Sequence, residues 1–214
     1  APQISAIELP AWTILVYMDA DNNLESYGIS DLEEMRAALT LLPDSAEIQL
    51  AVQIDRSAEY VVDELDDWSD TRRYANIQGE LQLIESIGEV NMGSADTLTD
   101  FVEWGVSSYP AEKIGLIMWG HGVGWQGIAW DQDDGVPDSK PGRMRSAEIG
   151  SAIQTGLAHS KHEKPLDLIG FDACLMGSLE IQSSLKDYAY FYVASEEQEP
   201  GHGWNYTPIE LGCT

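Results

Sequence analysis

Apolar runs alternate with amphipathic segments along most of the chain. The first run, Trp12–Met18, is continuous and rich in β-branched residues, which is typical of a central strand covered on both faces. Four more strands are predicted, and helices are predicted between them. The later strands are Glu47–Asp55, Ile114–Trp119, Leu166–Phe171 and Tyr188–Ala194; the helices are one that follows the polar loop Asp19–Glu25 and runs to about Leu42, then Ser94–Ser108, Ser146–His159 and Met176–Leu185. This alternation predicts a mostly parallel α/β sheet.

Two segments depart from this alternation. Tyr60–Leu65 and Arg72–Ile77 are separated by a polar turn and predict a β-hairpin appended to the sheet. Asp131–Arg145 lacks periodicity and contains several Pro and Gly residues, so we expect an irregular loop. The chain has no internal repeat or convincing linker, which predicts a single domain spanning residues 1–214.

The composition excludes some classes of partner. The 214 residues include 37 acidic against 11 basic side chains, a formal net charge of -26. A nucleic-acid partner is not expected, because such binders present a basic stripe. The simplest interpretation is a solvated acidic surface, while a saline habitat or bound cations are alternatives. No apolar run reaches the roughly 18 residues that a membrane span needs.

The most reactive side chains follow two of the predicted strands. His121 comes directly after the strand that ends in Trp119-Gly120, and Cys174 comes shortly after the strand that ends at Phe171. Ligands of parallel sheets bind at the carboxyl ends of strands, so the imidazole and the thiol can meet there. Together they can provide a thiolate nucleophile and an acid/base group. The alternatives are a buried, inert cysteine and a histidine held in a tight turn.

Neighbouring groups extend this hypothesis. A helix beginning near Met176 would favour the charged thiolate of Cys174. The N–H groups of Gly122 and Cys174 could hold a developing oxyanion. Asp172 lies on the same face of its strand as Cys174 and could accept a basic side chain, although loop N–H groups could equally satisfy it.

Acidic residues also follow the last predicted strand. Glu196, Glu197 and Glu199 could add negative potential at the same edge of the sheet, and His202 lies between two glycines just beyond them. The two cysteines cannot build a disulfide framework, so Cys174 is expected to be a free thiol.

Four segments carry a resemblance to a known family. They are Ile14–Glu25, Ile117–Gly122 followed by Gly124-Trp125, Leu168–Met176 and Ser195–Trp204. The chain resembles the clostripain-like cysteine peptidases, relatives of the caspases, gingipains and legumains. The resemblance implies a caspase-like three-layer sandwich, a His121–Cys174 dyad, and an endopeptidase that cleaves peptide or protein substrates after Arg or Lys. It implies a substrate site formed by Asp172, Ser195, Glu196, His202 and Trp204.

The chain departs from the family pattern at one position. We expect an acidic residue where His202 stands, so the preference for Lys or Arg should be weaker than in an enzyme with two pocket carboxylates. Because the family usually continues beyond this length, the chain is interpreted as a trimmed catalytic core or a compact member. Family members can be cut between the dyad residues, and Arg143 or Arg145 is the better candidate here, since Lys140 precedes a proline. A surface loop without processing would have the same sequence.

The resemblance requires no cofactor, and no metal ligand is assigned. Calcium remains an alternative because Asp19–Asn23 and Asp131–Gly135 are rich in oxygen donors, although neither fits an EF-hand loop. Zinc held by His121, Cys174 and His202 is disfavoured by their spacing. We expect a secreted or periplasmic location.

Two other functions remain open at this point. A catalytically silent relative could bind peptides or glycans at the same edge, and a small-amide hydrolase could use the same dyad on other substrates.

Overall fold

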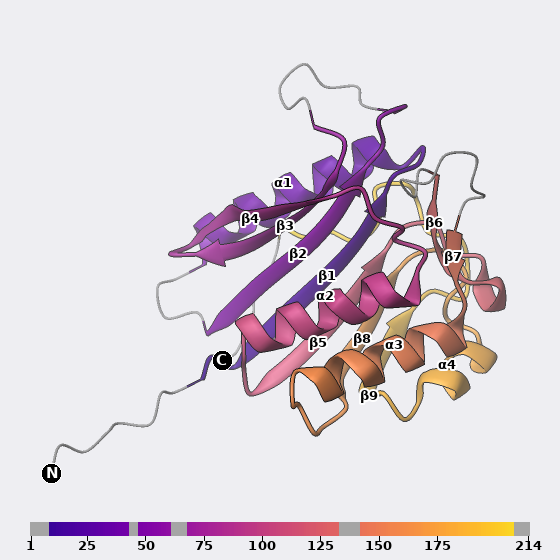
Figure 1. The fold of residues 1–214 in the computed structure, drawn as a ribbon. Coiled ribbons are helices and arrows are strands. Elements are labelled where there is room, and N and C mark those ends of the chain that lie inside the picture. The colour runs from indigo at the N-terminus through magenta and orange to yellow at the C-terminus, as the bar shows by residue number, and fades with distance from the viewer. Residues whose placement is uncertain (1–8, 43–46, 61–67, 133–141, 208–214) are drawn as a thin grey trace, which may run out of the picture.

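A seven-stranded sheet lies between two layers of helices in this computed structural model, which describes residues 9–42, 47–60, 68–132 and 142–207. The strand order is β4-β3-β2-β1-β5-β8-β9. Helix α1 covers one face, and α2, α3 and α4 cover the other (Figure 1). The strands of this sheet are β1 Trp12–Ala20, β2 Ile48–Arg56, β3 Thr71–Ile77, β4 Glu80–Gly88, β5 Lys113–Trp119, β8 Leu166–Asp172 and β9 Ala189–Ala194; the helices are α1 Glu25–Leu41, α2 Ala95–Ser108, α3 Ser146–His159 and α4 Leu179–Leu185.

Strand β1 shows why both faces of the sheet are covered. Leu15 and Tyr17 are buried among residues of α2 and α3, whereas Val16 and Met18 are buried among residues of α1. Successive side chains on a strand point to opposite faces, so a strand buried on both sides must be apolar throughout. The predicted α/β sandwich with a mostly parallel sheet is confirmed: β1 pairs in parallel with β2 and β5, and β8 pairs in parallel with β5 and β9.

The predicted helices are confirmed with one exception. Ser94 caps α2, its side chain accepting a hydrogen bond from the Asp96 N–H at 3.2 Å. The exception is the helix predicted from Met176, because α4 begins at Leu179. Leu175 has φ of +63°, and the Gly177 N–H donates to the Ser195 carbonyl, so this segment bonds to the chain beyond β9 instead of coiling.

The appended hairpin is formed by different strands from those predicted. Thr71–Ile77 is a strand as expected, but its hairpin partner is β4, Glu80–Gly88. Gln78 and Gly79 both have positive φ, which is the backbone of a two-residue hairpin turn. Residues 61–65 of the predicted partner lie outside the described residues. Strand β4 escaped prediction because most of its side chains are exposed or half-buried, so it lacks an apolar run.

A second, short hairpin lies at the end of the sheet where β1 finishes. It consists of β6 Ile128–Asp131 and β7 Gly142–Met144 (Figure 1). The Gln132 N–H donates to the Asp21 carbonyl, which attaches this hairpin to the loop after β1. Part of the segment predicted as an irregular loop is therefore ordered strand.

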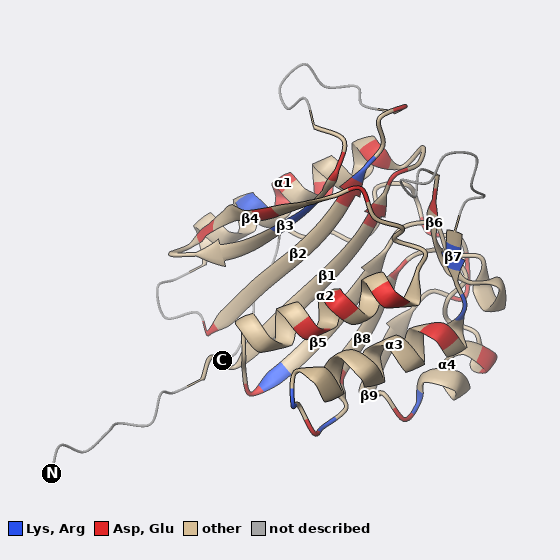
Figure 2. Ribbon diagram, in the orientation of Figure 1, with Lys and Arg blue, Asp and Glu red and all other residues tan. Residues whose placement is uncertain are grey.

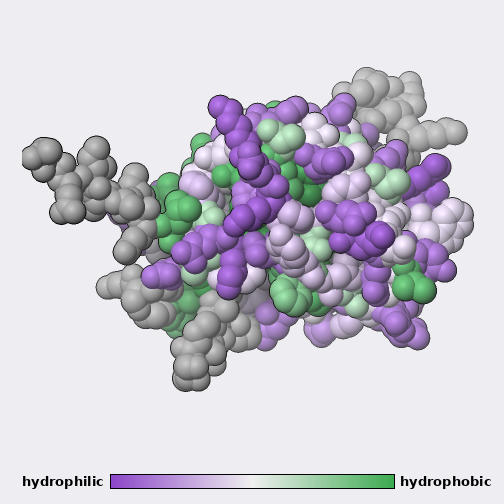
Figure 3. Space-filling model, turned by 90° about the horizontal axis from the view of Figure 1, so that it is seen from below, coloured by the Kyte–Doolittle hydropathy of each residue, from purple (hydrophilic) through white to green (hydrophobic). Residues whose placement is uncertain are grey.

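Acidic residues are distributed over the helices and loops, as Figure 2 shows. Lys161, Lys164 and Lys186 lie in the loops that follow α3 and α4, at the amino ends of β8 and β9. Seen from below, the surface is mostly hydrophilic with small separate apolar patches (Figure 3). Across the described parts of the chain, no helix combines the length and apolarity that crossing a membrane requires.

Candidate active site

The register of the central strands brings His121 and Cys174 together. Strands β5 and β8 are parallel, and their last paired residues are Trp119 and Asp172. His121 and Cys174 each lie two residues beyond that pair, so extending the register sets them side by side. The Gly120 N–H donates to the Asp172 carbonyl at 3.2 Å, which continues the strand contact past the regular ladder.

A small cavity opens between these strand ends. Its volume is about 150 Å³, and both His121 and Cys174 line it. The other lining residues come from the loop after β1, the ends of β5 and β8, and the segment beyond β9: Leu24, Trp119, Gly120, Asp172, Ala173, Glu199, Pro200, Gly201 and Gly203. Four separate stretches of the chain thus converge on one imidazole and one thiol.

The His121 ring is oriented by a residue that the sequence did not single out. Nε2 of His121 lies 2.8 Å from Oδ1 of Asn23. An amide oxygen only accepts, so this contact is a hydrogen bond when Nε2 carries the proton, and Nδ1 is then the basic nitrogen. Partial burial keeps the pKa of His121 below its ordinary value. The imidazole is therefore neutral near pH 7 and can accept a proton.

Cys174 is a free, half-buried thiol. Its sulfur accepts a hydrogen bond from the Glu199 N–H at 3.3 Å. Since α4 begins at Leu179, the turn of residues 175–178 separates Cys174 from the helix N-terminus that was expected beside it. Backbone groups of Glu199, rather than a helix end, thus contact the sulfur among the described residues.

Gly122 packs against the backbone of Cys174. A Cβ at position 122 would lie 2.3 Å from the Cys174 carbonyl oxygen and 3.0 Å from the Cβ of Ala173, so only glycine permits this approach. Within the described residues, the N–H groups of Gly122 and Cys174 donate to no other group. An oxyanion site requires such unused donors, and the role of these two N–H groups stays a prediction.

Asp172 is buried at the base of the same cavity. Its Oδ2 accepts hydrogen bonds from the Trp204 N–H at 3.0 Å and from the Tyr206 hydroxyl at 2.9 Å. Burial raises the pKa of Asp172, and these hydrogen bonds partly oppose that rise. Hydrogen bonds from the loop satisfy one oxygen of Asp172, as one interpretation predicted. The carboxyl group also lines the cavity, as the other interpretation, binding of a basic side chain, requires.

The remaining predicted substrate-site residues lie around the cavity and not in its lining. Trp204 packs against Gly170 and donates its Nε1–H to the Glu199 carboxylate, so it helps to fix the position of that side chain. Ser195 lies beside the turn at Gly177, and Glu196 is exposed. His202 is also exposed, although its charge acts weakly on Asp172. Contacts of these four residues with substrate stay a prediction.

The two processing candidates lie next to the second hairpin. Arg143 is an exposed residue of β7, and its guanidinium lies over the Trp130 ring, 5.7 Å from its centre. Arg145 precedes α3, and its N–H donates to the Glu148 carboxylate at 2.8 Å. Lys140 lies outside the described residues.

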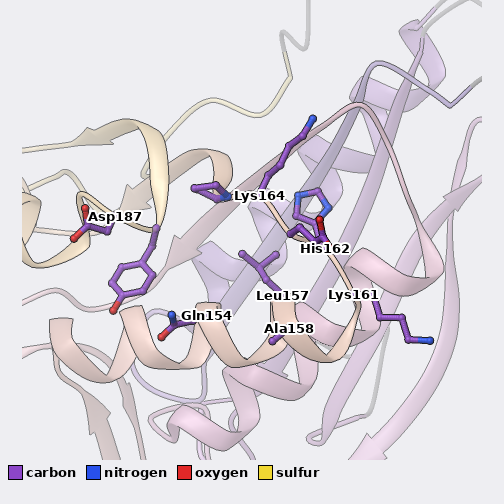
Figure 4. Close-up of a pocket in the computed structure, with 10 residues that line it drawn as sticks. Gln154, Leu157, Ala158, Lys161, His162, Lys164 and Asp187 are labelled. Carbon is purple, nitrogen blue, oxygen red and sulfur yellow. The ribbon is translucent and has the colours of Figure 1, made fainter.

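A larger hollow lies at the opposite edge of the sheet. Its volume is about 810 Å³, and residues of α3, of the loop before β8 and of the loop before β9 line it (Figure 4). Leu157 faces it from α3, whereas Lys161 points away. Its lining contains no cysteine, serine or threonine, and the pKa of His162 is lowered there by burial. The smaller cavity, which a thiol and an imidazole line together, is therefore the candidate active site.

The two oxygen-rich segments considered for calcium converge in the fold. Asp19, at the end of β1, and Asp131, at the end of β6, are both buried and act on each other electrostatically. Burial raises the pKa of Asp19 to about 8 and that of Asp131 to about 9, so protons neutralise them at pH 7. Of the residues described, no three His, Cys, Asp or Glu side chains form a metal-binding group. Calcium at these oxygens stays a prediction.

These buried carboxyl groups predict a pH-dependent stability. Because the folded pKa values lie above those of the unfolded chain, the stabilisation is complete below about pH 4 and is lost as pH rises through 8 to 9. We expect Asp131→Asn, which keeps the shape, to match the unaltered protein in melting temperature at pH 4. At pH 9 it should melt on the order of 5 °C higher. Equal melting temperatures at both pH values would contradict a buried proton on Asp131.

Comparison with known proteins gives consistent matches. The model of the clostripain family matches residues 16–211. Clostripain from Hathewaya histolytica is 35% identical in an alignment 192 positions long that covers 79% of this chain and 35% of that protein. This chain thus spans about a third of the length of that relative.

Solved structures agree in fold. A secreted C11 cysteine protease from Bacteroides thetaiotaomicron, in complex with an irreversible peptide inhibitor, superposes with a TM-score of 0.72 at 25% identity, covering 92% of this chain and 52% of that chain. An inactive zymogen C11 protease from Parabacteroides distasonis superposes with a TM-score of 0.68 at 20% identity, covering 95% of this chain and 53% of that chain. The predicted caspase-like fold is confirmed.

Proposed function

The chain belongs to the clostripain family, and on that premise we propose that it is a cysteine endopeptidase whose reacting groups are Cys174 and His121. The observation that carries the proposal is their shared position at the ends of β8 and β5, in one cavity. Since the chain spans only part of its relatives, the activity proposed is that of the domain described.

The proposed mechanism starts with proton transfer. Nδ1 of neutral His121 takes the proton of the Cys174 thiol, and the thiolate attacks the substrate carbonyl carbon to form a C–S bond. Asn23 accepts from Nε2–H and so favours the tautomer in which Nδ1 is free to take the proton. His121 then gives its proton to the leaving amine as the C–N bond breaks. Water hydrolyses the thioester, which releases the acid and restores the thiol.

The proposed oxyanion site uses the backbone. The N–H groups of Gly122 and Cys174 donate to no other described group and flank the thiol, so they are available when negative charge develops on the carbonyl oxygen. Such donors stabilise the transition state more than the ground state, because the oxyanion accepts stronger hydrogen bonds than a neutral carbonyl.

We propose cleavage after Arg or Lys. Asp172 supports this preference because it lines the cavity next to Cys174 and carries or gains a negative charge when a cation enters. The mechanism uses no cofactor, and calcium binding stays a prediction. A secreted location is proposed by analogy with the relative described as secreted; a periplasmic location is the alternative.

A peptide library tests this function. The endopeptidase proposal predicts cleavage of oligopeptides, with Arg or Lys before the cut. A small-amide hydrolase would instead hydrolyse glutamine-like amides and leave oligopeptides intact. A silent binding relative would cleave neither, so the three functions give three different results.

Processing of the chain itself is also proposed. If cleavage after a basic residue activates the enzyme, purified protein should accumulate a cut near Arg143 or Arg145, because both are exposed. The Cys174→Ala variant should stay intact under the same conditions, as intact-mass measurement would show. Full activity of a chain that remains uncut would exclude a required cleavage.

A further inference from the structure

A second acidic side chain, Glu199, lines the cavity next to Asp172. It lies on the segment that follows β9. The backbone of Glu199 is attached to the thiol, since its N–H donates to the Cys174 sulfur at 3.3 Å. The carboxylate of Glu199 is held as well, because Trp204 Nε1 donates a hydrogen bond to Glu199 Oε1 over an N-to-O distance of 3.4 Å. Glu199 therefore has a defined position beside the reacting sulfur.

Asp172 and Glu199 both line the cavity, and their carboxyl groups are close enough to share a hydrogen bond. Two carboxylates have no donor between them, so this contact requires one proton. Burial is the main cause that raises the pKa of both groups, and the contact raises the pKa of Glu199 further. While this contact is made, the pair holds one proton and one negative charge, as carboxyl groups in close contact do elsewhere.

The surroundings leave this charge without a fixed cation. No Lys or Arg in the described residues forms an ion pair with Asp172 or Glu199. Exposed His202 faces the pair from the chain beyond β9, and Tyr206 donates to Asp172. From α1, Asp31 also acts on Asp172; burial raises its pKa to about 7, and it accepts from Trp119 Nε1–H at 2.7 Å.

We propose that Asp172 and Glu199 form a proton-sharing acidic pair that binds the Lys or Arg side chain before the scissile bond and releases its proton when that side chain enters. This rests on the proposed peptidase function. A cation within a few ångströms favours the ionised form of both carboxyl groups, so binding expels the shared proton to solvent. Glu199 thereby supplies the second carboxylate that the sequence lacks at His202.

Two matched peptides test the pair kinetically. They differ only in Arg or norleucine before the cut, and the ratio of their kcat/KM values cancels the ionisation of the dyad. In the unaltered protein the ratio should rise with pH above the usual carboxyl range, as the pair ionises. In Glu199→Gln the ratio should fall about tenfold or more and lose that contribution to its pH dependence.

A matched control separates the pocket from net charge. Glu197 is exposed on the same segment and lies outside the cavity lining, so Glu197→Gln changes the net charge equally. It should keep the Arg-to-norleucine ratio and its pH dependence. Equal effects of the two variants would overturn the proposal, because the change in net charge alone would then explain the effect of Glu199→Gln. Asp31 is still present in Glu199→Gln, so its titration cannot account for a pH dependence that this variant loses.

Calorimetry tests proton release with Glu199 unchanged, so the test does not require a Glu199 variant to fold. In a Cys174→Ser background, whose hydroxyl can still accept from the Glu199 N–H, a peptide ending in Arg is titrated in two buffers of different ionisation enthalpy. About one proton should be released per bound peptide near pH 6. If the peptide binds and no proton is released, the pair is overturned although the peptidase proposal stands. If the protein with Cys174 intact cleaves no peptide at all, the proposed function itself fails.

Discussion

Replacing Cys174 by alanine is expected to abolish peptide hydrolysis while the fold is retained. The change removes the only group in the cavity that can form a covalent bond with the substrate carbonyl in the proposed mechanism. The loss in kcat/KM should be about 10⁴-fold or more, as for removal of other catalytic nucleophiles. Little stability depends on the sulfur, whose described polar contacts are long ones to the Glu199 backbone at 3.3 and 3.8 Å.

The measurement is turnover of a fluorogenic Arg peptide, with thermal unfolding followed by circular dichroism. His121→Ala should show a similar loss, and combining both changes should add little, because the two residues act as one unit. Asn23→Ala keeps both reacting groups and should lose only part of the rate, since Asn23 orients the ring. Unchanged turnover in Cys174→Ala would reject the assignment of the nucleophile.

Replacing Asp172 by asparagine is expected to remove the preference for Arg or Lys. The amide oxygen can still accept from Trp204 and Tyr206, so the pocket should keep its shape. What is lost is a buried negative charge, and such a charge pair contributes on the order of 2 kcal/mol or more. We therefore expect the Arg-to-norleucine ratio of kcat/KM to fall about 30-fold or more.

The reverse change has a predicted direction as well. His202→Asp should strengthen the preference for Arg or Lys, because it adds negative charge near Asp172. Exposure of His202 limits the effect through solvent screening. A library profile of the unaltered enzyme that favours an acidic or apolar residue before the cut would contradict this account of the pocket, even with the dyad correct.

The sequence could predict the strands that carry the site because their apolar runs are unambiguous. His121 and Cys174 follow buried strands, and parallel strand ends meet at one edge. The alternation of Leu15 and Tyr17 with Val16 and Met18 between the two helical layers likewise follows from a continuous apolar run. In these cases local composition and global fold agree.

Contacts between distant loops could not be predicted. Asn23 lies 98 residues from His121 in sequence, and only the fold brings its amide to the ring. A polar loop directly after the central strand was the available signal. Glu199 was expected to add potential at this edge, but its position in the cavity depends on the bond from its N–H to Cys174.

The start of α4 and the strand β4 were mispredicted for a related reason. Gly177 bonds to Ser195, a residue beyond β9, and this tertiary contact replaces the helical hydrogen bonds that local sequence favours. Strand β4 is held by its pairing with β3 and has few buried side chains. Elements defined by partners, rather than by their own apolar pattern, are the ones that sequence reasoning misses.

Covalent labelling tests the central claim most directly. The protein is incubated with a peptidyl acyloxymethyl ketone that carries Arg next to the reactive carbon, and its intact mass and tryptic peptides are measured. The account predicts one adduct, on the peptide that contains Cys174, no adduct in Cys174→Ala, and slower labelling in His121→Ala. An adduct on another residue, or an unlabelled Cys174 in folded protein, would contradict it.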